Sequence, residues 1–205
     1  MKVYETNIKN ILIAVIFSSF LCAEISFTTG VSYGGVTYNE VISGHMNITN
    51  GIGFNGALEK SIGNVIVGAG YLHQTYVENF DSQVFDSSFK NTVTANYLTG
   101  HVIYPYEINR FRFWGGIQFG QCINGKMIRE ENQVETETTT DSDNYKLDYG
   151  ILVGTDIMFT KHIGTRFSYY YGIAKILSTD VALDSNISNL NVMNVGTSAQ
   201  LLFRF

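Results

Sequence analysis

Residues capable of acid–base or nucleophilic chemistry are scattered along this chain. The four histidines are His45, His73, His101 and His162. Neither a Gly-x-Ser-x-Gly elbow nor a His-Glu-x-x-His zinc motif accompanies them. A triad assembled from distant segments leaves no local motif, and His73 with Asp81 or Ser82 is the arrangement to examine in a structure. The sequence therefore favours a protein without a catalytic, cofactor or metal site.

Five charged residues share the polar side of segments in which apolar and polar residues alternate. They are Glu59, Arg112, Asp156, Arg166 and Arg204. If these segments are neighbouring strands, Arg112, Asp156 and Arg166 form one cluster on the inner side of a sheet. Buried charges are tolerated mainly when they are paired, so the first interpretation is structural ion pairing. The alternative interpretation is a charged gate in a conducting path.

The segment from residue 124 to residue 144 is rich in acidic residues and threonine. Its two cationic residues, Lys126 and Arg129, are outnumbered by Glu130, Glu131, Glu135, Glu137, Asp141 and Asp143. A charge run of this kind usually forms a solvated surface loop. The alternatives are a loop that contacts a ligand or a host, and a weak divalent-cation site, although the spacing matches no calcium-binding loop.

Alternation of apolar and polar residues is the dominant pattern from Glu24 onwards. The chain is 45% hydrophobic and only 15% charged, with 13 Tyr, 14 Phe and 20 Gly, a composition that favours strands and turns. The alternating runs, of which the fourth is weakest, lie around residues 25–34, 48–59, 65–71, 92–104, 111–120, 145–159, 166–173 and 193–205. Runs of about ten residues are long enough for tilted strands to cross the hydrocarbon layer of a membrane.

The two sides of these runs predict a narrow membrane barrel. The polar side is mostly Gly, Ser, Thr and Asn, which suit a crowded interior, whereas the bulky apolar side suits lipid. A soluble sandwich would carry many Lys and Glu residues on its polar side. We therefore predict an all-β fold, a closed antiparallel up-and-down transmembrane barrel of about eight strands. Such a barrel is only just wide enough for its own side chains, so we expect no general-diffusion pore.

The predicted links between the runs alternate in length. Short links are expected at residues 60–64, 105–110 and 160–164, and longer polar ones at 39–45, 77–91, 124–144 and 175–189. Short periplasmic turns and long extracellular loops are typical of bacterial outer-membrane barrels. This asymmetry places both termini in the periplasm.

The first 23 residues are expected to form a secretory signal peptide. Lys2 and Lys9 supply its positive start, residues 11–20 are apolar, and Ala23 is a small residue at the expected cleavage position. The apolar run is shorter than the ~20 residues that a membrane-spanning helix needs. Residues 24–205 are then the mature barrel domain, in which Cys122 is left without a partner for a disulfide.

Residues 194–205 carry the most specific local motif of the chain. The pattern polar-x-Gly-x-x-apolar-x-apolar, followed by aromatic residues, is matched by Asn194, Gly196, Ala199, Leu201, Phe203 and Phe205. Together with the alternating runs, this motif resembles the terminal-strand signal of small bacterial outer-membrane barrels of the opacity-protein, OmpA-barrel and OmpX-like kind. The resemblance implies recognition by the barrel-assembly machinery and insertion into the bacterial outer membrane as a multi-pass barrel.

The resemblance also implies a surface protein whose extracellular loops serve a structural, adhesive or interaction role. The expected partners are outer-membrane lipids and lipopolysaccharide, with a host or surface ligand bound through the loops. The net charge of −5 and the lack of a basic patch argue against nucleic acid as a partner. We expect no cofactor and no enzyme. The two alternatives are a narrow, porin-like ion channel and a membrane-embedded lipid-modifying enzyme.

Overall fold

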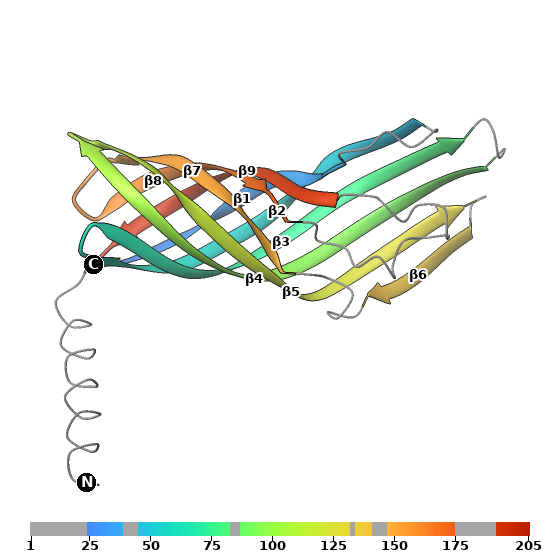
Figure 1. The fold of residues 1–205 in the computed structure, drawn as a ribbon, viewed down its shortest axis with the longest axis horizontal. Coiled ribbons are helices and arrows are strands. Elements are labelled where there is room, and N and C mark those ends of the chain that lie inside the picture. The colour runs from blue at the N-terminus through green and yellow to red at the C-terminus, as the bar shows by residue number, and fades with distance from the viewer. Residues whose placement is uncertain (1–23, 39–44, 83–86, 132–133, 141–146, 175–191) are drawn as a thin grey trace, which may run out of the picture.

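The computed structural model describes residues 24–38, 45–82, 87–131, 134–140, 147–174 and 192–205 (Figure 1). They form the strands β1 (Ile25–Tyr38), β2 (His45–Ile62), β3 (Val65–Ser82), β4 (Ser87–Ile108), β5 (Phe111–Glu131), β6 (Val134–Thr140), β7 (Asp148–Met158), β8 (Ile163–Gly172) and β9 (Val192–Arg204). No helix in these ranges is long and apolar enough to cross a membrane. The predicted signal peptide, residues 1–23, lies outside the described residues.

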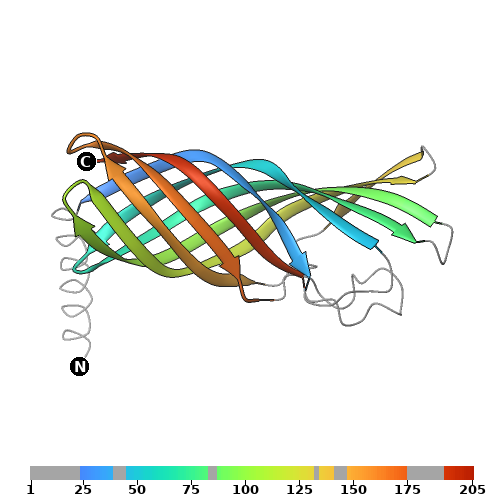
Figure 2. The ribbon, with the colours of Figure 1, turned by 90° about the horizontal axis from the view of Figure 1, so that it is seen from above.

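All strands except β6 close into a ring of antiparallel neighbours (Figure 2). The order is β4-β3-β2-β1-β9-β8-β7-β5, and pairing of β4 with β5 completes the circle. Within the described residues, β6 pairs only with the far part of β5. The predicted closed antiparallel barrel of eight strands is therefore confirmed, and β6 is an addition to it.

The alternation in the sequence separates an apolar outer face from a polar inner face. On β1, Val31 and Tyr33 point outward and are 58% and 52% exposed, whereas Ser26 and Thr28 are buried inside. On β4 the outward Leu98 is exposed, but the inward Ile103 is also apolar and fully buried. Apolar residues on both faces of β4 explain why the fourth alternating run is the weakest.

Three tight turns and the C-terminus lie at one end of the barrel, which we call the turn end (Figure 1). Glu24 lies there too, since its carbonyl accepts a hydrogen bond from Ser61 N at the end of β2. Gly63 and Asn109 occupy two of these turns with φ of 59° and 57°, a left-handed conformation that Gly and Asn adopt most readily. The predicted links 60–64 and 105–110 are too long, because β2 continues to Ile62 and β4 continues to Ile108. Pro105 is tolerated inside β4 because it lies past the last described β3–β4 pair, Ile66 with Ile103, so a β3–β4 ladder bond is not lost there.

At the opposite end, the loop end, several strands continue well beyond the barrel (Figures 1 and 2). Residues 45–50 of β2, 74–82 of β3, 87–96 of β4, 124–131 of β5 and 134–140 of β6 pair in this order and form what we call the projecting sheet. The prediction of loops at 77–91 and 124–144 was therefore wrong for most of these residues. His45, predicted in a loop, is the first residue of β2. Outside lipid a strand needs no apolar outer face, so the alternation that marks a strand in the sequence disappears.

Candidate functional site

Arg166 stands at the centre of an ion-pair cluster inside the barrel. Its Nε donates to Asp156 Oδ1 at 2.7 Å and its Nη2 donates to Asp156 Oδ2 at 3.0 Å. Its Nη1 donates to Glu59, on the far side of the barrel interior. The guanidinium carbon also lies 5.0 Å from the centre of the Trp114 ring, within range of a cation–π contact. Arg166 is only 3% exposed, so these contacts take the place of the water molecules that would solvate its charge.

Asp156 joins two arginines and an indole. Besides Arg166, it accepts hydrogen bonds from Arg112 Nε and from Trp114 Nε1, each at 2.9 Å. The strand register brings these residues together, because Asp156 pairs with Arg112 across β5–β7 and with Arg166 across β7–β8. The strands thus place three inward residues in one row.

Glu59 and its neighbours complete the cluster. Its carboxylate accepts a hydrogen bond from Ser26 Oγ at 3.2 Å and lies 2.9 Å from His101 Nε2. We call Glu59, Arg112, Asp156 and Arg166 the interior ion-pair cluster; its two cations and two anions balance. The order Ser26–Glu59–His101 does not fit a catalytic triad, in which the histidine lies between the acid and the nucleophile.

Arg204 lies apart from this cluster, at the rim of the turn end. Its Nε is 3.0 Å from Glu24 Oε1, and its Nη2 donates to Glu107 Oε1 at 3.2 Å. Glu107 is also 3.7 Å from Arg112 Nη1, and therefore connects Arg204 with the interior. The structure thus brings four of the five predicted interior charges together and places the fifth at the rim.

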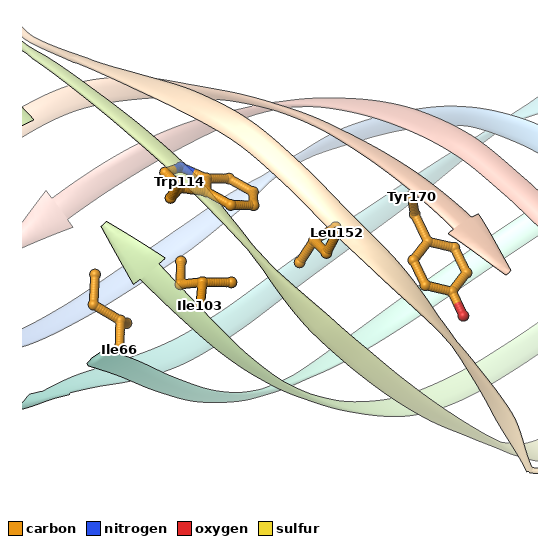
Figure 3. Close-up of a cluster of buried hydrophobic side chains, with 5 residues drawn as sticks. All are labelled: Ile66, Ile103, Trp114, Leu152 and Tyr170. Atoms are coloured by element: carbon orange, nitrogen blue, oxygen red, sulfur yellow. The ribbon is translucent and has the colours of Figure 1, made fainter. Parts of the chain in front are cut away.

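A group of apolar side chains is also buried inside the barrel (Figure 3). This group consists of Ile66, Ile103, Trp114, Leu152 and Tyr170. A cavity of about 90 Å³ is lined by Arg166, His101 and several hydroxyl and amide side chains. This is far below the roughly 300–1,000 Å³ of typical ligand pockets, and it suits a few water molecules. A cavity of this size does not admit a sugar-sized solute.

Asp148 is a buried acidic residue that the sequence analysis did not select. Tyr170 Oη donates to its Oδ1 at 2.8 Å, and Asn194 Nδ2 donates to its Oδ2 at 2.9 Å. Its position on the inward side of an alternating run was the only sequence signal for this role. Asn194, selected as part of the terminal motif, thus also serves as a buried hydrogen-bond donor.

The other residues of the terminal motif form the outer and inner faces of β9. Leu201 is exposed on the outer face, and the Phe203 ring stacks on Phe27 with centroids 6.3 Å apart. The amide of Phe205 donates to Ile25 O at 2.8 Å, so the last strand is bonded to β1 up to its final residue. Gly196 and Ala199 pair with Gly34 and Val31 of β1.

The acidic segment forms a β5–β6 hairpin at the tip of the projecting sheet. Glu130 lies 3.6 Å from Lys90 Nζ, and Glu137 lies 2.9 Å from Lys126 Nζ. Glu135 is exposed on the last strand. The side chain of Glu131, and Asp141 and Asp143 altogether, lie outside what the structure describes. Over the described residues, no group of three or more His, Cys, Asp or Glu could hold a metal ion.

The sequence matches a known family over residues 19–178, that of the outer membrane protein beta-barrel domain. The chain belongs to this family. A search of curated proteins found no match. The family assignment places this outer membrane protein beta-barrel in the bacterial outer membrane. Short turns of such barrels face the periplasm, so the turn end lies on the periplasmic side.

Solved structures of small barrels resemble this outer-membrane barrel over most of their length. Neisserial surface protein A has 13% identity and a TM-score of 0.50, covering 88% of this chain and 97% of that one. The attachment invasion locus protein Ail of Yersinia pestis has 15% identity and a TM-score of 0.48, covering 89% and 99%. E. coli outer membrane protein W has 12% identity and a TM-score of 0.48, covering 89% and 98%. At such identities the likeness concerns the fold alone.

The histidines and Cys122 of this outer-membrane barrel take ordinary structural positions where the structure describes them. His73 Nδ1 lies 2.7 Å from Asn96 Oδ1, and the His162 ring lies 3.0 Å from the Arg204 carbonyl. The side chains of His45, Asp81 and Ser82 fall outside the description. Cys122 is fully buried, and its Sγ donates to Asn124 O at 3.3 Å.

Proposed function

We propose that this protein is a non-enzymatic outer-membrane surface protein whose barrel anchors the projecting sheet for attachment to, or interaction with, another surface. The observation that carries this proposal is the continuation of β2 to β6 beyond the lipid-facing part of the barrel. The outward residues of β4 change from Leu98 and Val102, which suit lipid, to Lys90, Thr92 and Thr94, which suit water. In this proposal the projecting sheet therefore lies outside the membrane.

The barrel interior supports the same proposal. The ion-pair cluster and the apolar group of Figure 3 fill it, and its cavity of about 90 Å³ is too small for a nutrient or a lipid headgroup. Transport and catalysis inside the barrel are therefore less favoured than binding by the parts outside it. Lipopolysaccharide surrounds the barrel in this proposal, and the barrel-assembly machinery inserts it through β9.

Shortening the hairpin tests this function. Replacing residues 128–137 by Asn-Gly joins Met127 to Thr138, which already pair, through a favourable two-residue turn. We expect cells that display this variant to attach at least several-fold less to epithelial monolayers and to gelatin-coated glass than cells with the wild-type chain. A boiled-versus-unboiled gel shift checks that both barrels are folded and present in equal amounts. Equal attachment by both would contradict the proposal.

A further inference from the structure

Among the described residues, the β6 strand presents a free edge at the outermost part of the projecting sheet. It is seven residues long, and among the described residues its backbone pairs on one side only, with Gly125–Glu131 of β5. The side chains of Val134, Glu135, Thr136 and Glu137 are all exposed. An edge strand of this kind is a template to which another extended chain can add.

The charges along this edge determine which kind of extended chain can pair with β6. Glu135 stands directly opposite Glu130, and Glu137 stands two residues further on the same face. Lys90 Nζ lies 3.6 Å from Glu130 and Lys126 Nζ lies 2.9 Å from Glu137, whereas no cation lies beside the carboxylate of Glu135 among the described side chains. The row from Lys90 through Glu130 to Glu135 therefore ends, at the free edge, on an uncompensated negative charge.

A second copy of the chain fits this edge poorly. Pairing β6 with β6 would bring Glu135 and Glu137 of one copy close to the same residues of the other, and like charges on facing strands are destabilising. A strand with basic residues two positions apart would instead place its cations opposite Glu135 and Glu137 on one face.

We propose that β6 binds an extended polypeptide segment that carries lysine or arginine at alternate positions, as an added antiparallel strand. This inference deepens the proposed surface function and rests on it, because it names the part of the projecting sheet that makes the contact and the chemistry of its partner. Backbone hydrogen bonds supply affinity in this mode, and the two carboxylates supply selectivity.

A direct binding measurement tests the proposal. The full chain is refolded into phosphatidylcholine nanodiscs, which contain no anionic lipid that would attract a cationic peptide. The probe is a fluorescein-labelled peptide Lys-Thr-Lys-Thr-Lys-Thr-Lys, followed by anisotropy. We expect saturable binding, which the double variant Glu135→Gln, Glu137→Gln weakens about tenfold. The matched control is Glu107→Gln, which removes one carboxylate at the turn end and should leave binding unchanged.

Two N-methylated versions of the peptide separate strand addition from simple charge attraction. Each carries N-methyl groups on one set of alternate residues, so the charge is kept while one edge of the peptide loses its donors. We expect one of the two versions to bind much more weakly than the unmodified peptide. Equal binding of all three peptides, or no binding at millimolar concentration, overturns the proposal. If attachment nevertheless falls on shortening the hairpin, the surface function stands and only the β6 mechanism is lost.

Discussion

At the scale of single residues, Asp156 is the acid on which the interior charges depend. It is fully buried and hydrogen-bonds to Arg112, Trp114 and Arg166. The guanidinium groups of Arg112 and Arg166 compensate its negative charge. Glu59 compensates the second of these two positive charges. Removing one partner from such a group leaves a buried charge without compensation, and this costs more than the pair contributes.

The substitution Asp156→Asn is therefore expected to destabilise the folded barrel by about 3–5 kcal/mol. Urea unfolding from lipid vesicles measures this, with fluorescence of Trp114, the single tryptophan, as the signal. The double variant Asp156→Asn, Arg112→Gln restores the charge balance and should recover part of the loss. Glu107→Gln, at a side chain 57% exposed, should cost less than about 1 kcal/mol. A loss below 1 kcal/mol for Asp156→Asn would show that the cluster is not a stabilising unit.

At the scale of elements, the barrel closes where the first strand, β1, pairs with the last, β9. The two backbones pack closely at this seam. A Cβ on Gly30 would meet the backbone of β9, at Ala199 O and at 2.5 Å from Gln200 Cα. Backbone atoms in a closed ring cannot move aside as a flexible side chain can. Gly115, by contrast, has its nearest neighbour at 3.9 Å, the Cγ1 of Val153.

Gly30→Ala is accordingly expected to destabilise the barrel by about 1–3 kcal/mol, because the added methyl group forces β1 and β9 apart. Gly115→Ala makes the same chemical change where space exists, and it should alter stability by less than about 0.5 kcal/mol. Urea midpoints of both variants in the same lipid give the comparison. Similar losses for the two variants would mean that strand propensity, and not closure of the seam, sets the effect.

The projecting sheet extends into residues where apolar alternation predicts no strand. Residues 77–91 and 124–144 were expected as loops because apolar alternation stops there. In the described part of these ranges, residues 77–82, 87–91, 124–131 and 134–140, the strands continue, since their backbones pair and residues such as Thr92 and Thr136 favour extended structure. Alternation marks a strand only where one face meets lipid or a core.

At the scale of the whole molecule, the barrel is closed in two senses. Its ring of strands has no open edge within the membrane, and its interior is filled by paired charges and by the apolar group of Figure 3. An eight-stranded ring is just wide enough for its own side chains. The channel alternative therefore requires that the interior ion-pair cluster rearrange.

We expect the refolded protein to show no stepwise conductance in planar bilayers and no flux of sucrose from proteoliposomes. A gel shift first confirms that closed barrels were inserted, so that a lack of conductance and flux can be attributed to the barrel itself. Sucrose flux would contradict the filled interior directly. Reproducible conductance steps would favour the narrow channel and make Arg112, Asp156 and Arg166 the residues to test for ion selectivity.

The sequence by itself determined the barrel and its two faces. Lipid demands apolar side chains at every second position, so the alternation is visible residue by residue. It also put Arg112, Asp156 and Arg166 on consecutive ring strands, where pairing in register makes them neighbours. These features depend only on local period and on strand order.

Only the tertiary structure decided which residues meet across the interior and what lies outside the membrane. Glu59 reaches Arg166 although 107 residues separate them, and His101 and Trp114 join the same cluster. Such contacts depend on the stagger and closure of the ring, which no local pattern encodes. The projecting sheet with its free β6 edge was likewise hidden, because strands in water are held by pairing and carry no obligatory apolar face.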